Sequence, residues 1–144
     1  MDSKHLFVSL QGLERQEKML AILLRCIAAM LLLAVFPVFF PYAWMDAIHR
    51  AMGMGALPGE PIVGYLSRSL SAFYAMHGAL YWFLSNDVRR YRAAIRFLAI
   101  LGLIFGVWIA AMDWAEGMPL MWTCCEGPIV LALSALVFVY SRED

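Results

Sequence analysis

The residues of this chain best suited to chemistry lie in one short stretch, Asp113 to Pro128, which reads DWAEGMPLMWTCCEGP. It holds three carboxylates (Asp113, Glu116 and Glu126) and two of the three cysteines, but no lysine or arginine. Long apolar runs flank it on both sides. A polar segment without cations between two apolar runs is typical of a short external loop that dips back into a membrane.

Arg68 is the cation that could partner these carboxylates. A charge inside a bilayer costs at least ~2.5 kcal/mol, so an arginine there is expected to face other helices and find a partner. In the crossings predicted below, one layer near the outer surface contains Arg68, Asp113 and Glu126. We therefore predict an ion pair between Arg68 and either Asp113 or Glu126.

Together with Trp122 and His49, these three charged residues form the candidate ligand-binding pocket. Two interpretations remain open. The charges could form an internal salt bridge that only holds helices together. Alternatively, they could line a polar cavity open to the outside, which would bind an anionic headgroup or a small polar ligand.

The adjacent cysteines Cys124 and Cys125 argue against disulfide chemistry. Neighbouring Cα atoms are about 3.8 Å apart across a trans peptide, which is below the usual range for a disulfide. The chain also lacks the His and Cys spacing of a zinc site, so no metal site is predicted. Phosphate-binding loops, dinucleotide fingerprints and nucleophile elbows are absent too, so the sequence leaves the cofactor unknown.

The composition indicates a membrane protein. The chain is 63% hydrophobic and 15% charged, with a mean hydropathy of +0.72. A soluble domain is roughly 45–50% apolar and about 25% charged, so the apolar excess requires a lipid environment. Nucleic acid is excluded as a partner, because only one short basic segment is present where a basic face would be needed.

Four apolar runs predict an all-α protein, a bundle of four transmembrane helices in a single domain spanning residues 1–144. The crossings are expected at about 19–40, 62–84, 93–112 and 119–140. Each has the roughly 20 residues that span a ~30 Å hydrocarbon core. The first run is too long for a signal peptide and lacks a small-residue cleavage site.

Three local features refine this layout. Apolar residues recur every three or four positions after Pro41, which predicts a short interfacial helix in the first external loop, ended by Gly53 and Gly55. Pro128 predicts a break in the last helix near Glu126, although the helix could instead simply begin there. The third crossing has a ridge of small residues, Gly102, Gly106 and Ala110, which predicts close helix packing. Asp113 lies on the same face of this helix.

The cations predict the orientation. They are concentrated in the amino-terminal arm and in the loop NDVRRYR, residues 86–92, whereas the last loop has none. Under the positive-inside rule, this loop and both termini are cytoplasmic.

Several segments together resemble a known group of proteins: the proline-terminated first helix, RSLSAFYAMHGALYW (68–82), DVRRYR (87–92) and the closing GMPLMW…EGP. This layout resembles small four-helix proteins of the bacterial inner membrane that are loosely grouped with the DoxX-like families. The resemblance implies an inner-membrane location. Some of these relatives are accessory subunits of quinone-linked oxidoreductases, and most have no assigned activity, so the resemblance assigns no functional residue.

Two functions are consistent with the sequence. The first is a non-catalytic accessory subunit, or a module that binds lipid or a small ligand in an outward-facing polar pocket. Membrane lipid, a second copy of the chain or a larger membrane complex would then be its partners. The alternative is a membrane redox enzyme or quinone-linked partner that uses the same outer pocket.

Overall fold

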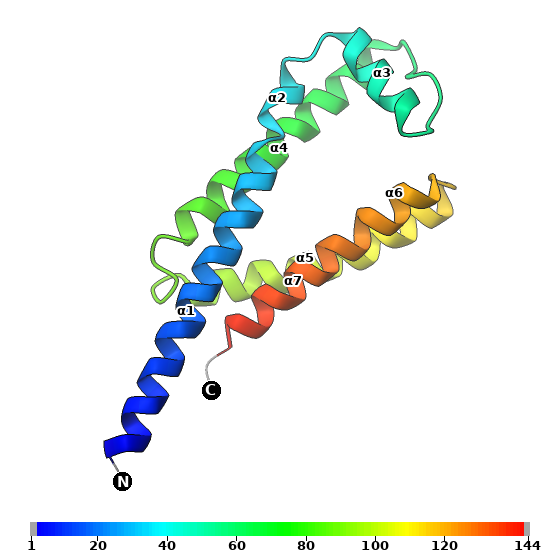
Figure 1. Ribbon diagram of the computed structural model, residues 1–144. Coiled ribbons are helices and arrows are strands. Elements are labelled where there is room, and N and C mark those ends of the chain that lie inside the picture. Colours follow the sequence, from blue (N-terminus) through cyan, green and yellow to red (C-terminus); the bar gives the residue numbers. More distant parts are fainter. Residues whose placement is uncertain (1–2, 143–144) are drawn as a thin grey trace.

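The chain folds into helices in the computed structural model, which describes the backbone of residues 3–142 and the side chains of residues 14–142 (Figure 1). No strand occurs within residues 3–142, so the predicted all-α class is confirmed. In chain order the helices are α1 (Ser3–Leu32), α2 (Val35–Val38), α3 (Tyr42–Ala51), α4 (Pro61–Leu84), α5 (Arg92–Ala115), α6 (Leu120–Cys125) and α7 (Gly127–Tyr140).

The long helices form two antiparallel hairpins that meet at one end and diverge toward the other (Figure 1). In the first arm α4 packs against α1 and α2, and in the second arm α7 packs against α5 and α6. Between the arms the main contact is between α1 and α7. The closed four-helix bundle predicted from the sequence is therefore not formed by one chain.

Three segments are long and apolar enough to cross a membrane: Glu14–Val38, Arg92–Ala115 and Leu120–Tyr140. They correspond to three of the four predicted crossings and indicate an integral membrane protein. Helix α4 is not among them, although its 24 residues equal the length of α5. Its hydropathy is lowered by polar residues at Ser67, Arg68, Ser71 and His77.

Glycines set the close approach of the helices within each arm. A Cβ atom on Gly78 of α4 would lie 2.8 Å from the backbone nitrogen of Leu32 and 2.9 Å from the carbonyl oxygen of Ala28. In the second arm, a Cβ on Gly106 would lie 2.8 Å from Cγ of Leu131. Only glycine permits such contact between helix backbones. For Gly78, Gly106 and Gly127, the nearest atoms belong to the same arm as the glycine.

The predicted small-residue ridge of α5 is confirmed as its contact face with α7. Gly102 lies against Ser134, and a Cβ on Gly127 would come within 2.7 Å of the Cβ of Ala110. Asp113 is buried on the same face near the carboxyl end of α5, as its position predicted.

The last crossing is interrupted where the sequence predicted a break. Helix α6 ends at Cys125 and α7 begins at Gly127, with Glu126 between them at φ −81° and ψ −75°. Pro128 has no N–H to donate to the carbonyl of Cys124. The backbone N–H of Glu126 still donates to the carbonyl of Trp122 at 2.9 Å, so the two helices remain nearly in line.

The predicted short helix in the first loop is also confirmed, as α3. It is followed by Gly53 and Gly55, whose φ angles of +81° and +78° lie in the left-handed region that favours glycine.

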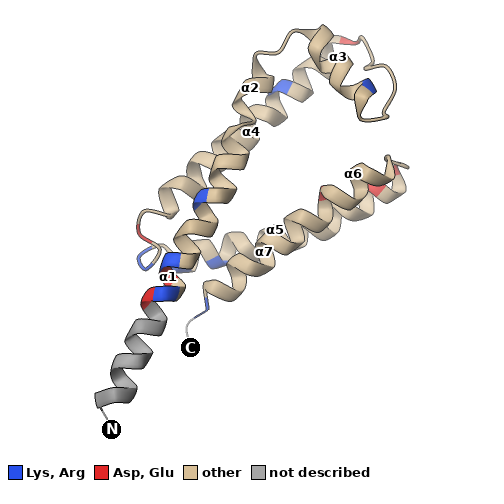
Figure 2. Ribbon diagram, viewed as in Figure 1, with Lys and Arg blue, Asp and Glu red and all other residues tan. Residues whose placement is uncertain are grey.

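Charge is distributed unevenly along this fold (Figure 2). The two arms meet beside the turn between α4 and α5, and both chain ends lie toward this end of the molecule. Most of the described cations gather here: Arg15, Lys18, Arg25, Arg89, Arg90, Arg92, Arg96 and Arg142. At the far end of the second arm the charges are acidic: Asp113, Glu116 and Glu126.

Candidate functional site

The far end of the second arm contains a buried carboxylate whose hydrogen bonding is incomplete. Asp113 is only 7% exposed, and its Oδ2 atom has no hydrogen-bond partner among the described residues. An unsatisfied polar atom away from water is unfavourable by about 1–3 kcal/mol, and more when it is charged. Such atoms are rare in folded proteins and often mark a functional site.

Two predicted site residues accompany Asp113. Glu126 is half-buried, and its carboxyl group interacts electrostatically with that of Asp113. The side chain of Trp122, one turn earlier, interacts with the same carboxyl group. Glu126 also acts electrostatically on Tyr74 of α4. The structure therefore brings together Asp113, Glu126 and Trp122.

Arg68 does not pair with either acid, and the ion pair predicted from the sequence is wrong for the single chain. Its guanidinium donates from Nη2 to the carbonyl of Phe40 at 3.0 Å and from Nη1 to the carbonyl of Gly64 at 3.3 Å. Helix α4 packs against α1 and α2 rather than against the second arm. Arg68 consequently satisfies a carbonyl just beyond the end of α2.

His49 belongs to a separate network that closes the first loop. Its Nδ1 lies 3.0 Å from the carbonyl oxygen of Gly55. Asp46 Oδ1 accepts the backbone N–H of Leu57 at 2.8 Å, and Oδ2 accepts Nε of Arg50 at 3.0 Å. The Leu57 N–H, followed by the Arg50 guanidinium, lowers the pKa of Asp46 below its usual value of 3.8. His49 thus has a role in loop structure.

The cysteines remain free thiols. Cys124 and Cys125 are exposed on α6, and Cys26 is exposed on α1. No group of three or more His, Cys, Asp or Glu side chains that could hold a metal occurs among residues 14–142.

A second polar cluster, centred on Glu17, lies where the arms meet. The Nε atom of Arg89 lies 2.6 Å from Glu17 Oε1 and 2.7 Å from Oε2, and Arg92 Nη2 lies 3.1 Å from Oε1. The sequence analysis missed this cluster, since 72 and 75 positions separate the partners. The excess of arginines over acids in the 86–92 loop was the available signal for a carboxylate partner elsewhere.

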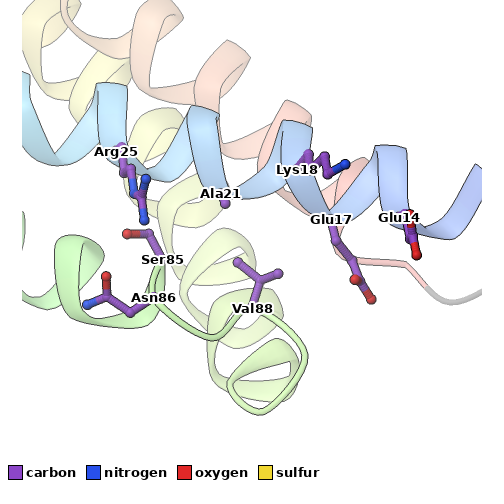
Figure 3. A pocket seen from close by; sticks show the side chains of 8 residues that line it. All are labelled: Glu14, Glu17, Lys18, Ala21, Arg25, Ser85, Asn86 and Val88. Atoms are coloured by element: carbon purple, nitrogen blue, oxygen red, sulfur yellow. The ribbon is translucent and has the colours of Figure 1, made fainter.

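A pocket of about 290 Å³ adjoins this cluster (Figure 3). The guanidinium of Arg25 points toward Ser85 and Asn86 across it. Its lining residues are Glu14, Glu17, Lys18, Ala21, Arg25, Ser85, Asn86 and Val88. A second pocket of about 360 Å³ lies between the start of α5 and the end of α7. It is lined by Arg92, Ala93, Arg96, Phe97, Ile100 and Ser141.

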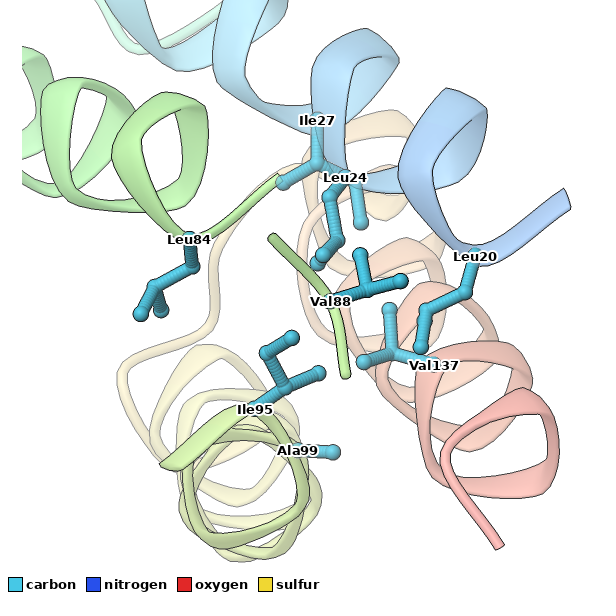
Figure 4. Packing of buried hydrophobic residues seen from close by; sticks show 8 residues of the cluster. All are labelled: Leu20, Leu24, Ile27, Leu84, Val88, Ile95, Ala99 and Val137. Carbon is cyan, nitrogen blue, oxygen red and sulfur yellow. The ribbon is translucent and has the colours of Figure 1, made fainter. Parts of the chain in front are cut away.

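Beneath these polar groups, buried apolar side chains from both arms form a common core (Figure 4). Its members come from α1, the end of α4, the turn that follows it, and α5 and α7 of the second arm: Leu20, Leu24, Ile27, Leu84, Val88, Ile95, Ala99 and Val137. The junction is therefore the place where one arm is fixed against the other.

No protein-family model matches the chain, and no curated protein and no solved structure matches it either. The resemblance to DoxX-like families therefore receives no support from these comparisons.

Proposed function

We propose that this chain is a non-catalytic integral membrane protein, an accessory subunit or ligand-binding module, whose outward-facing site is built around Asp113 and Glu126. The observation that carries the proposal is the buried, unpartnered Oδ2 atom of Asp113 beside a second carboxyl group. Two neighbouring carboxyl groups at this depth require a hydrogen-bond donor or a cation. A donor-bearing group would therefore bind here, such as an amine or hydroxyl of a lipid, a small ligand or a partner chain.

We further propose that α4 is the fourth crossing, with both termini in the cytoplasm of a bacterium and the protein in its inner membrane. Helix α4 lies antiparallel along α1 and has the length to span a bilayer. Its polar residues have internal partners, since Ser67 donates to the carbonyl of Val63 at 2.9 Å and Arg68 donates to two carbonyls. The cations at the junction favour a cytoplasmic location for that end.

In this proposal Arg68 remains available at the outer end of the first arm. Its guanidinium has five N–H donors and two carbonyl partners, so it retains capacity for an anionic group. A ligand or partner lying between the arms could contact Arg68 on one side and Glu126 on the other. A second copy of the chain could make the same two contacts by inserting one of its arms between the two arms of the first copy.

The test is purification of the full chain from native membranes in a mild detergent, followed by native mass spectrometry for retained lipid, quinone or partner chains. Asp113→Asn and Glu126→Gln should each lose the retained species, and Glu116→Gln serves as the matched control because this acid is exposed at the same end. Thermal unfolding of each variant separates loss of the ligand from loss of the fold. Equal retention by all three variants would contradict the proposal.

The same preparation tests the redox alternative. A retained quinone, with turnover that disappears when Cys124 and Cys125 are both changed to serine, would favour a redox enzyme over a binding module. Retention of a lipid or partner chain that is unaffected by these two serines would favour the proposal.

A further inference from the structure

We propose that the groove between the start of α5 and the end of α7 binds the phosphate headgroup of an anionic membrane lipid in the cytoplasmic leaflet. This site lies at the opposite end of the second arm from Asp113, so it goes beyond the function proposed above. The groove has a volume of about 360 Å³, within the roughly 300–1,000 Å³ range of small-molecule sites.

Two arginines line this groove, Arg92 and Arg96, and a third, Arg142, directly follows the lining residue Ser141. The guanidinium carbons of Arg96 and Arg142 lie 5.4 Å and 4.7 Å from the ring centroid of Phe138, so two cations share one aromatic ring. Arg92 joins them by donating from Nη1 to the carbonyl of Arg142 at 3.3 Å. The groove therefore collects positive charge from two helices that are far apart in sequence.

Little of this charge is neutralised by the described residues. Glu17 of α1 pairs with Arg92, but it is shared with Arg89. Arg96 and Arg142 have no ion pair with a carboxylate in the part of the chain that the structure describes. Like charges held this close together are unfavourable, and a bound anion would remove the repulsion.

An apolar surface continues from the arginines toward the membrane interior. Phe97 and Ile100 line the same groove and are 60% and 41% exposed. They lie along α5 from the arginines toward the middle of the helix, where acyl chains would run. A headgroup at Arg96 and Arg142 would place its acyl chain against these two side chains.

The chemistry favours a phosphodiester lipid. A guanidinium group has a planar fork of N–H donors that matches phosphate oxygens in two-point hydrogen bonding. Basic pockets between membrane helices on the cytoplasmic side suit anionic headgroups, because that leaflet is negatively charged. Phosphatidylcholine would bring its own cation next to the arginines, and inorganic phosphate would leave Phe97 and Ile100 uncovered.

The test titrates the purified full chain in detergent with phosphatidylglycerol, phosphatidylcholine or inorganic phosphate, and follows bound species by native mass spectrometry. Wild type should bind phosphatidylglycerol in preference to the other two. The double variant R96Q/R142Q should weaken binding about 25-fold, roughly fivefold per arginine at an anionic lipid surface. R96K/R142K keeps the charge without the guanidinium fork and should restore part of the affinity.

Arg90→Gln is the matched control, because Arg90 carries the same charge at the same end of the molecule, but its guanidinium lies over the ring of Tyr91 and not over Phe138. It should leave binding unchanged, and a loss equal to that of R96Q/R142Q would overturn the proposal in favour of general charge attraction. Equal binding of phosphatidylcholine, or of inorganic phosphate, would overturn it as well. If R96Q/R142Q fails to fold, the single variant R96Q provides the same comparison.

The acidic residues that end the chain provide one more check. Glu143 and Asp144 follow Arg142 in the sequence and lie outside the described residues. The variant E143Q/D144N should bind phosphatidylglycerol at least as strongly as wild type, because it removes only negative charge. Weaker binding would overturn the proposal. None of these variants touches Asp113 or Glu126, so failure here would leave the proposed function intact.

Discussion

Glu17 Oε1 lies 3.1 Å from Arg92 Nη2, and this ion pair connects α1 of the first arm with α5 of the second. The two side chains are only 16% and 13% exposed, so the pair is largely withdrawn from water. It adjoins the apolar core that contains Leu20 and Val137. Since the arms make their main contact between α1 and α7, this junction sets the angle between them.

The first prediction concerns Glu17. Changing Glu17 to Gln should lower the free energy of unfolding in detergent by about 2 kcal/mol, because hydrogen bonds to charged groups are worth roughly 1.5–3 kcal/mol. Thermal unfolding measures the loss. Glu14→Gln is the control, since Glu14 is exposed on the same helix face and should change stability by less than about 0.5 kcal/mol. Equal stability of the two variants would mean that the ion pair does not hold the arms.

The second prediction concerns the contact between Gly127 and Ala110. Gly127→Ala should destabilise the second arm by about 1–3 kcal/mol, because the new Cβ would lie 2.7 Å from that of Ala110. Adding Ala110→Gly should restore little of the loss, as measured by thermal unfolding, because the new Cβ would still lie 2.9 Å from the backbone nitrogen of residue 110. Gly59→Ala is the control, because a Cβ there has nothing within 4 Å. Equal losses for Gly127→Ala and Gly59→Ala would show that Gly127 and Ala110 are not in close contact.

The third prediction concerns pH and the first loop. The pKa of Asp46 is lowered below 3.8 by the Leu57 N–H and by Arg50, so the folded loop favours the ionised carboxylate. Its contribution to loop stability is fully present above pH 3.8 and is lost as the pH falls through the lower folded pKa. The amide resonance of Leu57 should therefore titrate below pH 3.8 in nuclear magnetic resonance spectra. Asp46→Asn should abolish that titration, and a midpoint above 3.8 in the unaltered chain would contradict the assignment.

The fourth prediction concerns the topology of α4. In a background without the native cysteines, single cysteines at Gly59 and Asn86 mark the two ends of this helix. If α4 crosses the membrane, a membrane-impermeant thiol reagent should label position 86 only from the cytoplasmic side and position 59 only from outside. Labelling of both from the same side would place α4 on the membrane surface.

Much of the secondary structure could be predicted from the sequence because local rules govern it. Apolar runs of about 20 residues predicted the long helices, and Pro128 predicted the break at Glu126 through its missing N–H. The glycine spacing on α5 predicted its contact face, since residues four apart lie on one side of a helix. Each of these features depends on residues that are close together in the chain.

The placement of Arg68 could not be predicted in this way. The sequence predicts its depth along the crossing, but depth does not specify which neighbouring helix α4 packs against. Gly78 fits closely against Ala28 and Leu32, and this contact holds α4 to α1. Arg68 consequently donates to the carbonyl of Phe40 instead of a carboxylate on the second arm.

The sequence by itself determined that this is a helical membrane protein, roughly where its long apolar helices run, and which residues carry charge among apolar neighbours. Only the tertiary structure decided how those charges combine: Asp113 with Glu126, and Glu17 with Arg92 across 75 positions. The physical reason is that helix formation depends on local hydrogen bonds and hydropathy. The pairing of charges depends instead on which helix faces fit closely enough to exclude lipid and water, and small residues such as Gly78 and Gly127 determine that fit.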